Sequence, residues 1–366
     1  MNPPLKIPNV NYKEMKDILQ DLSFSELENL MAEWGEKPFR AKQLYEGLMR
    51  GKRISDIPAV PSSLKEKLLE VYEDEPVKIL EKLTSADGTE KYLFALADGN
   101  IIEGVLMGYK YGNTQCVSTQ VGCRMGCKFC ASTLGGLKRN LTAGEIACQI
   151  LLLNAAHGGD LKNRQVTNVV LMGSGEPLDN YRNVVKFLRN ISAAGGINIS
   201  PRNISLSTCG LVPKIYELAD ENLPVNLTIS LHQTTDEGRA RTMPVANKYK
   251  IAEILKACDY YFSKTGRRYI FEYSLIDGEN CGREHAEGLI KLLSGRPCHV
   301  NLIRLNEVKE RKLLSPTKEQ AYKFLGLLEK GGLSATLRRQ MGNDIGGACG
   351  QLRNSFIEET EDIDEN

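Results

Sequence analysis

Short apolar runs alternate with amphipathic stretches from about Cys116 to Gln340. The runs have the length of buried strands, and the stretches carry apolar residues three and four positions apart, as helices do. We expect strands over residues 168–172, 204–207, 226–230, 269–274, 300–303 and 335–337. We expect helices over residues 142–156, 179–194, 212–220, 251–264, 283–293 and 317–330. Repeated β-α units imply parallel strands, so the pattern predicts an α/β fold with a full or partial TIM-type (βα) barrel.

The N-terminal part has a different pattern, in which polar helices come before a β-rich stretch. Apolar spacing predicts helices within residues 12–21, 25–34 and 40–48, and strand-like sequence begins near Val77. The predicted layout is a helical accessory domain over 1–75, a β-rich connection over 76–115, a barrel over 116–352 and an acidic disordered tail over 353–366.

Charge divides the chain into a basic body and an acidic tail. Residues 358–366 hold six acidic side chains and no basic one, so the net charge of +1 leaves +7 on the rest. Within the accessory domain, Arg40, Arg50, Lys52 and Arg53 offer basic groups to a phosphate backbone, although a solvated helix face explains them equally well. The charge therefore permits a nucleic-acid partner without requiring one.

Composition is that of a globular protein, with 42% apolar residues in a chain of 366. Residues 1–12 lack a basic region leading into an apolar core, so we expect no secretory signal. No apolar run approaches the roughly 20 residues that a membrane helix needs. We expect a cytoplasmic protein, in which thiols stay reduced and clustered cysteines indicate metal binding or catalysis.

Three of the ten cysteines, Cys123, Cys127 and Cys130, follow a C-x₃-C-x₂-C spacing. A structural zinc ion takes four protein ligands, and no His or Cys lies at ordinary spacing after Cys130. Cys148 is 18 residues further on within an apolar helix and is interpreted as a core residue. The spacing predicts an iron–sulfur cluster in which one iron has no protein ligand and is open to a substrate.

Polar residues follow several of the predicted strands. Gly175 and Glu176 lie in a glycine-rich turn where a ligand can approach the backbone and where a carboxylate can accept from an ammonium group. Ser207, the run 230–232 and Asn306 follow three other strands. Each is weak evidence alone, but the ends of parallel strands meet at one face of a barrel. The pattern predicts a ligand site beside the cluster.

The cysteine spacing resembles the signature of the radical S-adenosylmethionine enzymes, whose open iron binds the amine and carboxylate of that cofactor. Further stretches resemble the RlmN/Cfr family of RNA adenosine methyltransferases, namely residues 116–123, 137–145, 173–178, 230–232, 299–303 and 344–352. The resemblance extends from Phe39 to Leu352, and a partial barrel ending in a methyl-carrier loop is the fold that it implies.

The resemblance implies a [4Fe-4S] cluster and two molecules of S-adenosylmethionine per turnover. Cys349 would take a methyl group from one cofactor molecule, and a 5′-deoxyadenosyl radical made from the second would remove a hydrogen atom from that methyl group. The carbon would then add to adenine. Cys116 would release the product by forming a transient disulfide with Cys349, and Glu103 matches the proton acceptor.

The resemblance also assigns the cofactor-binding residues Gly175, Glu176, Ser207, Ser230, Leu231, His232 and Asn306. Without it, Glu103 would be interpreted as an exposed strand carboxylate and Cys349 as a loop cysteine. The remaining cysteines at 209, 258, 281 and 298 are interpreted as structural or incidental.

The implied activity is formation of 2-methyladenosine in the peptidyl-transferase region of 23S rRNA and in tRNA, 3′ to the anticodon. The implied partners are these RNAs and an electron donor such as flavodoxin or ferredoxin, and we expect a monomer. Arg304, where the housekeeping branch usually has proline, leaves open a Cfr-like enzyme that methylates carbon 8 and confers antibiotic resistance. Two further alternatives are a radical enzyme for a small molecule, in which Cys349 would be idle, and a metal-stabilised RNA-binding protein without catalysis.

Overall fold

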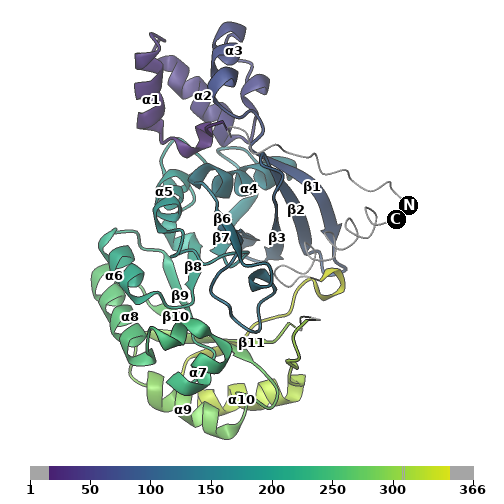
Figure 1. The fold of residues 1–366 in the computed structure, drawn as a ribbon, viewed down its shortest axis with the longest axis vertical. Coiled ribbons are helices and arrows are strands. Elements are labelled where there is room, and N and C mark those ends of the chain that lie inside the picture. The colour runs from purple at the N-terminus through teal and green to yellow at the C-terminus, as the bar shows by residue number, and fades with distance from the viewer. Residues whose placement is uncertain (1–15, 307, 309, 347–366) are drawn as a thin grey trace.

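A single ten-stranded sheet runs through the protein, in a computed structural model that describes residues 16–306, 308 and 310–346 (Figure 1). Its strands follow one another in the order of the chain, apart from the two strands of a separate hairpin. They are β1 (Val77–Thr84), β2 (Glu90–Leu96), β3 (Ile101–Tyr109), β4 (Gly112–Cys116), β7 (Val166–Leu171), β8 (Ile204–Thr208), β9 (Asn226–Ser230), β10 (Tyr269–Leu275), β11 (Cys298–Arg304) and β12 (Ala335–Leu337).

Seven of these strands, β4 and β7 to β12, are parallel and form the barrel part of the sheet. Helices lie between successive strands because each crossover must return the chain to the same end of the sheet. They are α4 (Ala143–Ala156), α5 (Tyr181–Ser192), α6 (Val212–Asp220), α7 (Asp236–Thr242), α8 (Ile251–Thr265), α9 (Arg283–Leu293) and α10 (Lys318–Lys330). Among the described strands β12 pairs with β11 alone, so the sheet stays open. The prediction of an α/β partial barrel is confirmed.

The first strands extend this barrel as an antiparallel sheet. β1, β2, β3 and β4 pair in turn, with Val105 of β3 opposite Cys116 of β4. Cys116 also lies beside Val170 of β7 in the parallel register. The β-rich connection expected from the sequence is therefore continuous with the barrel rather than a separate layer.

Helices α1 (Phe24–Glu33), α2 (Phe39–Met49) and α3 (Ser62–Val71) form a unit at one end of the molecule (Figure 1). The prediction of a helix over residues 12–21 is wrong for its described part. Asp17 bridges to Tyr72, and only a 3-10 turn forms at Leu19–Asp21. This turn places the Asp21 carboxylate where its Oδ1 accepts from the Gly144 amide at 2.6 Å, at the start of α4. The short 3-10 turn therefore contacts the start of α4 instead of continuing as a helix.

Local signals in the sequence account for the starts of two barrel helices. Thr142 with Glu145, and Thr317 with Gln320, form the expected capping boxes. Two elements were not predicted: helix α7, and a hairpin of β5 (Gln120–Gly122) and β6 (Leu137–Asn140). Both are too short for periodicity to reveal. No helix within the described part of the chain is long and apolar enough to cross a membrane.

Gly144 tests the packing of the N-terminal unit on α4. A Cβ at this position would lie 2.8 Å from the Asp21 amide nitrogen and 2.9 Å from the Gln20 carbonyl carbon. Because backbone atoms cannot move aside cheaply, we expect Gly144→Ala to lower the free energy of unfolding by about 1–3 kcal/mol, measured by urea denaturation.

Gly326→Ala is the matched control. It replaces a glycine of α10 with no heavy atom within 4 Å of the added Cβ, and should raise the free energy of unfolding by about 0.4–1 kcal/mol. Equal effects of the two substitutions would contradict the packing at Gly144.

Candidate active site

The loop that carries the three cysteines is held between the two strands of the β5–β6 hairpin. Gly122, with φ +76°, turns the chain into this loop, and a Cβ there would collide with the Gly136 carbonyl oxygen. The Cys123 amide then donates to that same oxygen at 3.0 Å. Further along, the Lys128 amide donates to the Thr242 carbonyl at 2.9 Å, which fastens the loop to α7. Backbone contacts at both ends thus fix where the thiols lie.

A cavity of about 260 Å³ lies between this loop and the carboxyl ends of the barrel strands. The three cysteines at 123, 127 and 130 line it together with six of the seven predicted cofactor-binding residues. Those six are Gly175, Glu176, Ser207, Ser230, His232 and Asn306. Residues from five separate parts of the chain are therefore brought to one site.

The three thiols are largely withdrawn from water, since Cys123 and Cys127 are buried and Cys130 is half-buried. Burial raises the pKa of Cys123 to about 12 and raises the pKa of Cys127 as well, because a thiolate loses its hydration. Such thiols ionise readily only beside strong positive charge, which the irons of a cluster provide. In the described part of the chain, no three His, Cys, Asp or Glu side chains surround one point as a single ion would need. Three thiols spread over a cavity wall suit a cluster, because each binds a different iron.

Glu176 presents a buried carboxylate to the cavity. Its Oε2 accepts from the Cys209 amide at 2.7 Å, and its Oε1 accepts from the Leu178 amide at 3.0 Å. Burial raises the pKa of this carboxyl, while the amide hydrogen bonds oppose the rise. Each carboxylate oxygen has a second lone pair, so the group can still accept from a ligand ammonium.

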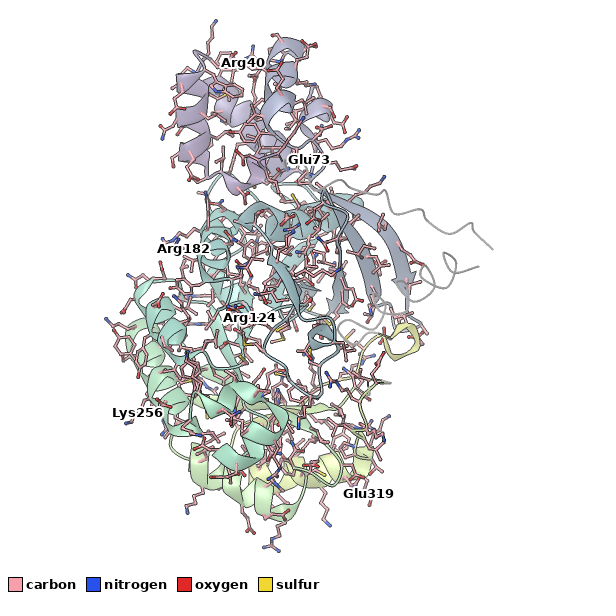
Figure 2. All side chains as sticks on the ribbon, viewed as in Figure 1. Arg40, Glu73, Arg124, Arg182, Lys256 and Glu319 are labelled. Carbon is pink, nitrogen blue, oxygen red and sulfur yellow. The ribbon has the colours of Figure 1, made fainter. Side chains whose placement is uncertain are left out.

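The turn that holds Glu176 is joined closely to the strand before the cluster loop. A Cβ on Gly175, which has φ +110°, would lie 2.8 Å from the Gln120 amide nitrogen. The side-chain oxygen of Gln120 accepts from the Glu176 amide at 2.8 Å. On the loop itself, Arg124, which Figure 2 labels, donates to Asp179 at 2.5 Å, and Asp179 is three residues beyond Glu176. The carboxylate and the cysteine loop are therefore positioned relative to each other.

His232 is buried at the end of β9 in a defined protonation state. Its Nδ1 accepts from the Ser274 amide at 2.9 Å, so the proton of the neutral ring is on Nε2. Burial lowers the pKa of His232 to about 3. The ring contacts Phe129 of the cysteine loop edge to face, with centroids 4.8 Å apart. His232 thus offers one N–H donor at neutral pH.

Leu231 is the predicted cofactor-binding residue that does not line the cavity. It is fully buried, and its amide donates to the Glu272 carbonyl at 3.0 Å. Arg304 also lies away from the cavity. Its guanidinium donates to the Pro316 carbonyl and to the side-chain oxygen of Gln340, at 2.9 and 3.1 Å.

Glu103 and Cys116 lie outside this cavity but share one face of the antiparallel sheet. Side chains directly opposite each other across strands point to the same face, as do residues two apart on one strand. Val105 is opposite Cys116, and Glu103 is two positions before Val105. Glu103 is buried, with 7% of its surface exposed, rather than being an exposed strand carboxylate. Cys349 lies outside the described residues.

Several cavity residues were not found from the sequence. Glu272 and Arg338 line the cavity, and the signal for Glu272 was the single charged residue of a strand made mainly of aromatic and aliphatic residues. Cys209, interpreted from the sequence as structural or incidental, lines the cavity too and packs with Cys127.

Arg239 of α7 was also missed, and it is completely buried behind the site. Its Nη2 donates to the carbonyls of Cys209 and Ser230, at 2.5 and 3.1 Å. Because only the folded chain brings α7 under the cysteine loop, nothing in the local sequence signalled this contact.

The comparisons with known proteins agree with this geometry. Residues 117–293 match the family model described as the Radical SAM superfamily. The chain is similar to the crystal structure of a radical SAM methyltransferase from Sphaerobacter thermophilus, with a TM-score of 0.87 and 40% identity over 92% of this chain and 98% of that one. Fold, thiol spacing and cavity together define a radical S-adenosylmethionine methyltransferase, a class that uses a [4Fe-4S] cluster and S-adenosylmethionine.

Curated relatives make the assignment more specific. A protein of Clostridium perfringens, named as a probable dual-specificity RNA methyltransferase RlmN, is 52% identical over 94% of this chain and 98% of its own length. One of Clostridium botulinum with the same name is 54% identical over 95% of this chain and 99% of its own length. The chain belongs to the RlmN family of RNA methyltransferases. An enzyme is thereby favoured over the alternative of an RNA-binding protein without catalysis.

Gly122 tests how the hairpin positions the cysteine loop. Because a Cβ there would collide with the Gly136 carbonyl, Gly122→Ala should displace Cys123 and lower the iron bound per chain after anaerobic reconstitution to well under half of the wild-type content. Iron content and visible absorbance measure the effect. Gly135→Ala is the control, since it is in the same loop and meets no atom within 4 Å. Wild-type iron content in Gly122→Ala would show that the turn does not govern the cluster loop.

Proposed function

We propose that this enzyme methylates carbon 2 of an adenosine in the peptidyl-transferase region of 23S rRNA and of the adenosine 3′ to the anticodon in tRNA. The names of the curated relatives describe dual-specificity RNA methyltransferases, which supports two RNA substrates. The proposal includes a methyl-cysteine intermediate on Cys349, with Cys116 and Glu103 as its partners.

One observation carries the proposed chemistry. The segment leading to Cys349 lies against the strand face that holds Glu103 and Cys116. The Lys91 ammonium donates to the Gly346 carbonyl at 2.6 Å, and Lys91 is opposite Val105 in the same register that places Val105 opposite Cys116. Cys349 is three residues beyond Gly346 in the sequence. This supports a meeting of the two thiols, although they are more than 230 residues apart.

We assign the formation of the radical to the cavity. When bound, the cluster supplies the electron that cleaves S-adenosylmethionine to a 5′-deoxyadenosyl radical. We assign cluster binding to Cys123, Cys127 and Cys130. We assign cofactor binding to Gly175, Glu176, Ser207, Ser230, Leu231, His232 and Asn306, with Leu231 limited to its backbone because its side chain is buried. Glu176 would hold the cofactor ammonium, and Nε2 of His232 would donate a hydrogen bond.

On the sheet face, the Cys349 sulfur would accept the methyl group, and the 5′-deoxyadenosyl radical would take one hydrogen atom from it, so that the remaining carbon radical adds to adenine. The adduct would give up one electron, returned to the cluster, and Glu103 would accept the proton lost from the substituted ring carbon. The Cys116 thiolate would then attack the Cys349 sulfur to form the disulfide. The electron pair of the broken carbon–sulfur bond would stay on the new carbon, which would take up a proton to become the methyl group. A reductant must restore both thiols before the next turnover.

The helical unit at 1–75 is our candidate for RNA binding. Arg53 is paired with Asp56 at 2.7 Å, whereas Arg50 is exposed, and Arg40 lies on α2 in the helical unit at one end of the molecule (Figure 2). We keep the layout of 76–115 as connection, 116–352 as barrel and 353–366 as tail, of which the tail lies outside the described residues. A flavodoxin or ferredoxin as donor, a monomeric state and a cytoplasmic location complete the proposal.

Nucleoside mass spectrometry of 23S rRNA and tRNA from a deletion strain tests the proposed reaction. We expect 2-methyladenosine to disappear from both RNAs, to return with the wild-type gene and to stay absent with Cys349→Ala, because that variant lacks the carbon carrier. Cys281→Ala, at a half-exposed cysteine in the loop before α9, is the control and should restore the nucleoside. Unchanged 2-methyladenosine in the deletion strain would refute the proposal.

The same chromatogram decides between the two ring carbons. Loss of 8-methyladenosine would support the Cfr-like alternative that Arg304 left open in the sequence.

A further inference from the structure

The turn between β1 and β2 makes a set of hydrogen bonds to a segment more than 250 residues away. Asp344 accepts from the Ser85 hydroxyl at 2.5 Å and from the Ala86 amide at 2.9 Å. In the other direction, the Gly342 amide donates to Asp87 Oδ2 at 3.0 Å. In Figure 1 the yellow C-terminal segment lies beside the ends of these two strands. We call residues 85–87 together with Lys91 the carrier dock.

The turn is preorganised for this contact. The Ser85 amide donates to the Thr89 carbonyl at 2.8 Å, and the Thr89 amide donates to Asp87 Oδ1 at 2.9 Å. Gly88 supplies the positive φ of +85° that the turn needs. The donors for Asp344 are therefore already in place, and binding the segment costs little ordering of the hairpin. The hydrogen bonds from Ser85 and Ala86 lower the pKa of Asp344, so the carboxylate form is the one that binds.

Lys91 connects the carrier dock to the proposed proton acceptor. Its ammonium is completely buried and lies 3.5 Å from Glu103 Oε2, while it donates to the Gly346 carbonyl at 2.6 Å. A buried ammonium needs such partners to offset its lost hydration. One charge is thus shared between the carboxylate of Glu103 and the segment that leads to Cys349.

We propose that the carrier dock holds residues 342–346 so that Cys349 is delivered to Cys116 and Glu103, and that Lys91 is the positioning residue that couples this docking to Glu103. The inference rests on the proposed function, because it presupposes that Cys349 carries the methyl group. It goes further by assigning the β1–β2 hairpin a role in the reaction. The hairpin acts on where the carrier lies and leaves the cluster and its cavity unchanged.

Asp344→Ala is the direct test, carried out on the reconstituted full-length enzyme. It removes both hydrogen bonds to the hairpin at an exposed side chain, so the fold should survive. We expect faster amide exchange in peptides covering 85–89 and 338–346. We also expect about tenfold less methylated adenosine for each 5′-deoxyadenosine released, because a displaced carrier meets the radical less often. Iron content and binding of S-adenosylmethionine should stay at the wild-type level.

Glu319→Gln is the matched control, since Glu319 is an exposed carboxylate on α10 (Figure 2). It should leave exchange in both peptides and the product ratio unchanged. If Asp344→Ala behaves like this control in exchange and in product ratio, the inference is wrong.

Lys91→Met provides a second, independent test of the coupling. If Lys91 acts through the docked segment, the double variant with Asp344→Ala should have a product ratio no lower than that of the worse single variant. If the fold-losses in product ratio of the two single variants multiply in the double variant, Lys91 acts independently of the docked segment, and its role as the positioning residue is wrong.

Two variants distinguish a failure of the proposed function from a failure of the carrier dock alone. Methylated adenosine from Cys349→Ala would refute the carrier mechanism whatever Asp344→Ala does. Loss of product in Cys349→Ala, with a normal product ratio in Asp344→Ala, would refute the carrier dock alone.

Discussion

Strand β4 hydrogen-bonds to β3 on one side and to β7 on the other, and this double pairing is what the rest of the structure depends on. Because one strand serves both ladders, the antiparallel extension and the parallel barrel cannot shift relative to each other without breaking a register. Cys116 lies at the end of that strand, and Cys123, the first cysteine of the cluster loop, is seven residues further on. The shared strand therefore fixes the position of the cysteine-lined cavity relative to the sheet face that holds Glu103.

The cavity itself is organised by hydrogen bonds to buried polar groups. Amides hold both oxygens of Glu176, and another amide selects the tautomer of His232. Arg239 satisfies two carbonyls at the ends of neighbouring strands. Since buried polar groups are costly unless paired, each of these contacts also limits how the strand ends can move. Rigid donors and acceptors are what a site needs to hold a cofactor in one orientation.

The two proposed chemical tasks use different parts of the chain. Residues 117–293 carry the superfamily core, whereas the carrier dock comes from the β1–β2 turn and β2, and the segment that it binds comes after β12. Lys91 is the residue at which these distant parts meet the proposed proton acceptor. The added hairpin therefore contributes contacts that the common core of the superfamily cannot provide.

Much of this arrangement was readable from the residues alone, because it rests on local signals. Apolar spacing identified the barrel elements, capping boxes marked two helix starts, and the spacing of three cysteines indicated the cluster. Strand ends pointed to Glu176 and His232 because parallel strands finish at one edge. Contacts between distant segments left no such signal. The short hairpin β5–β6, the buried Arg239, the bridge from Lys91 to Glu103 and the capping of α4 by Asp21 all depend on residues brought together by packing, which no periodicity along the chain records.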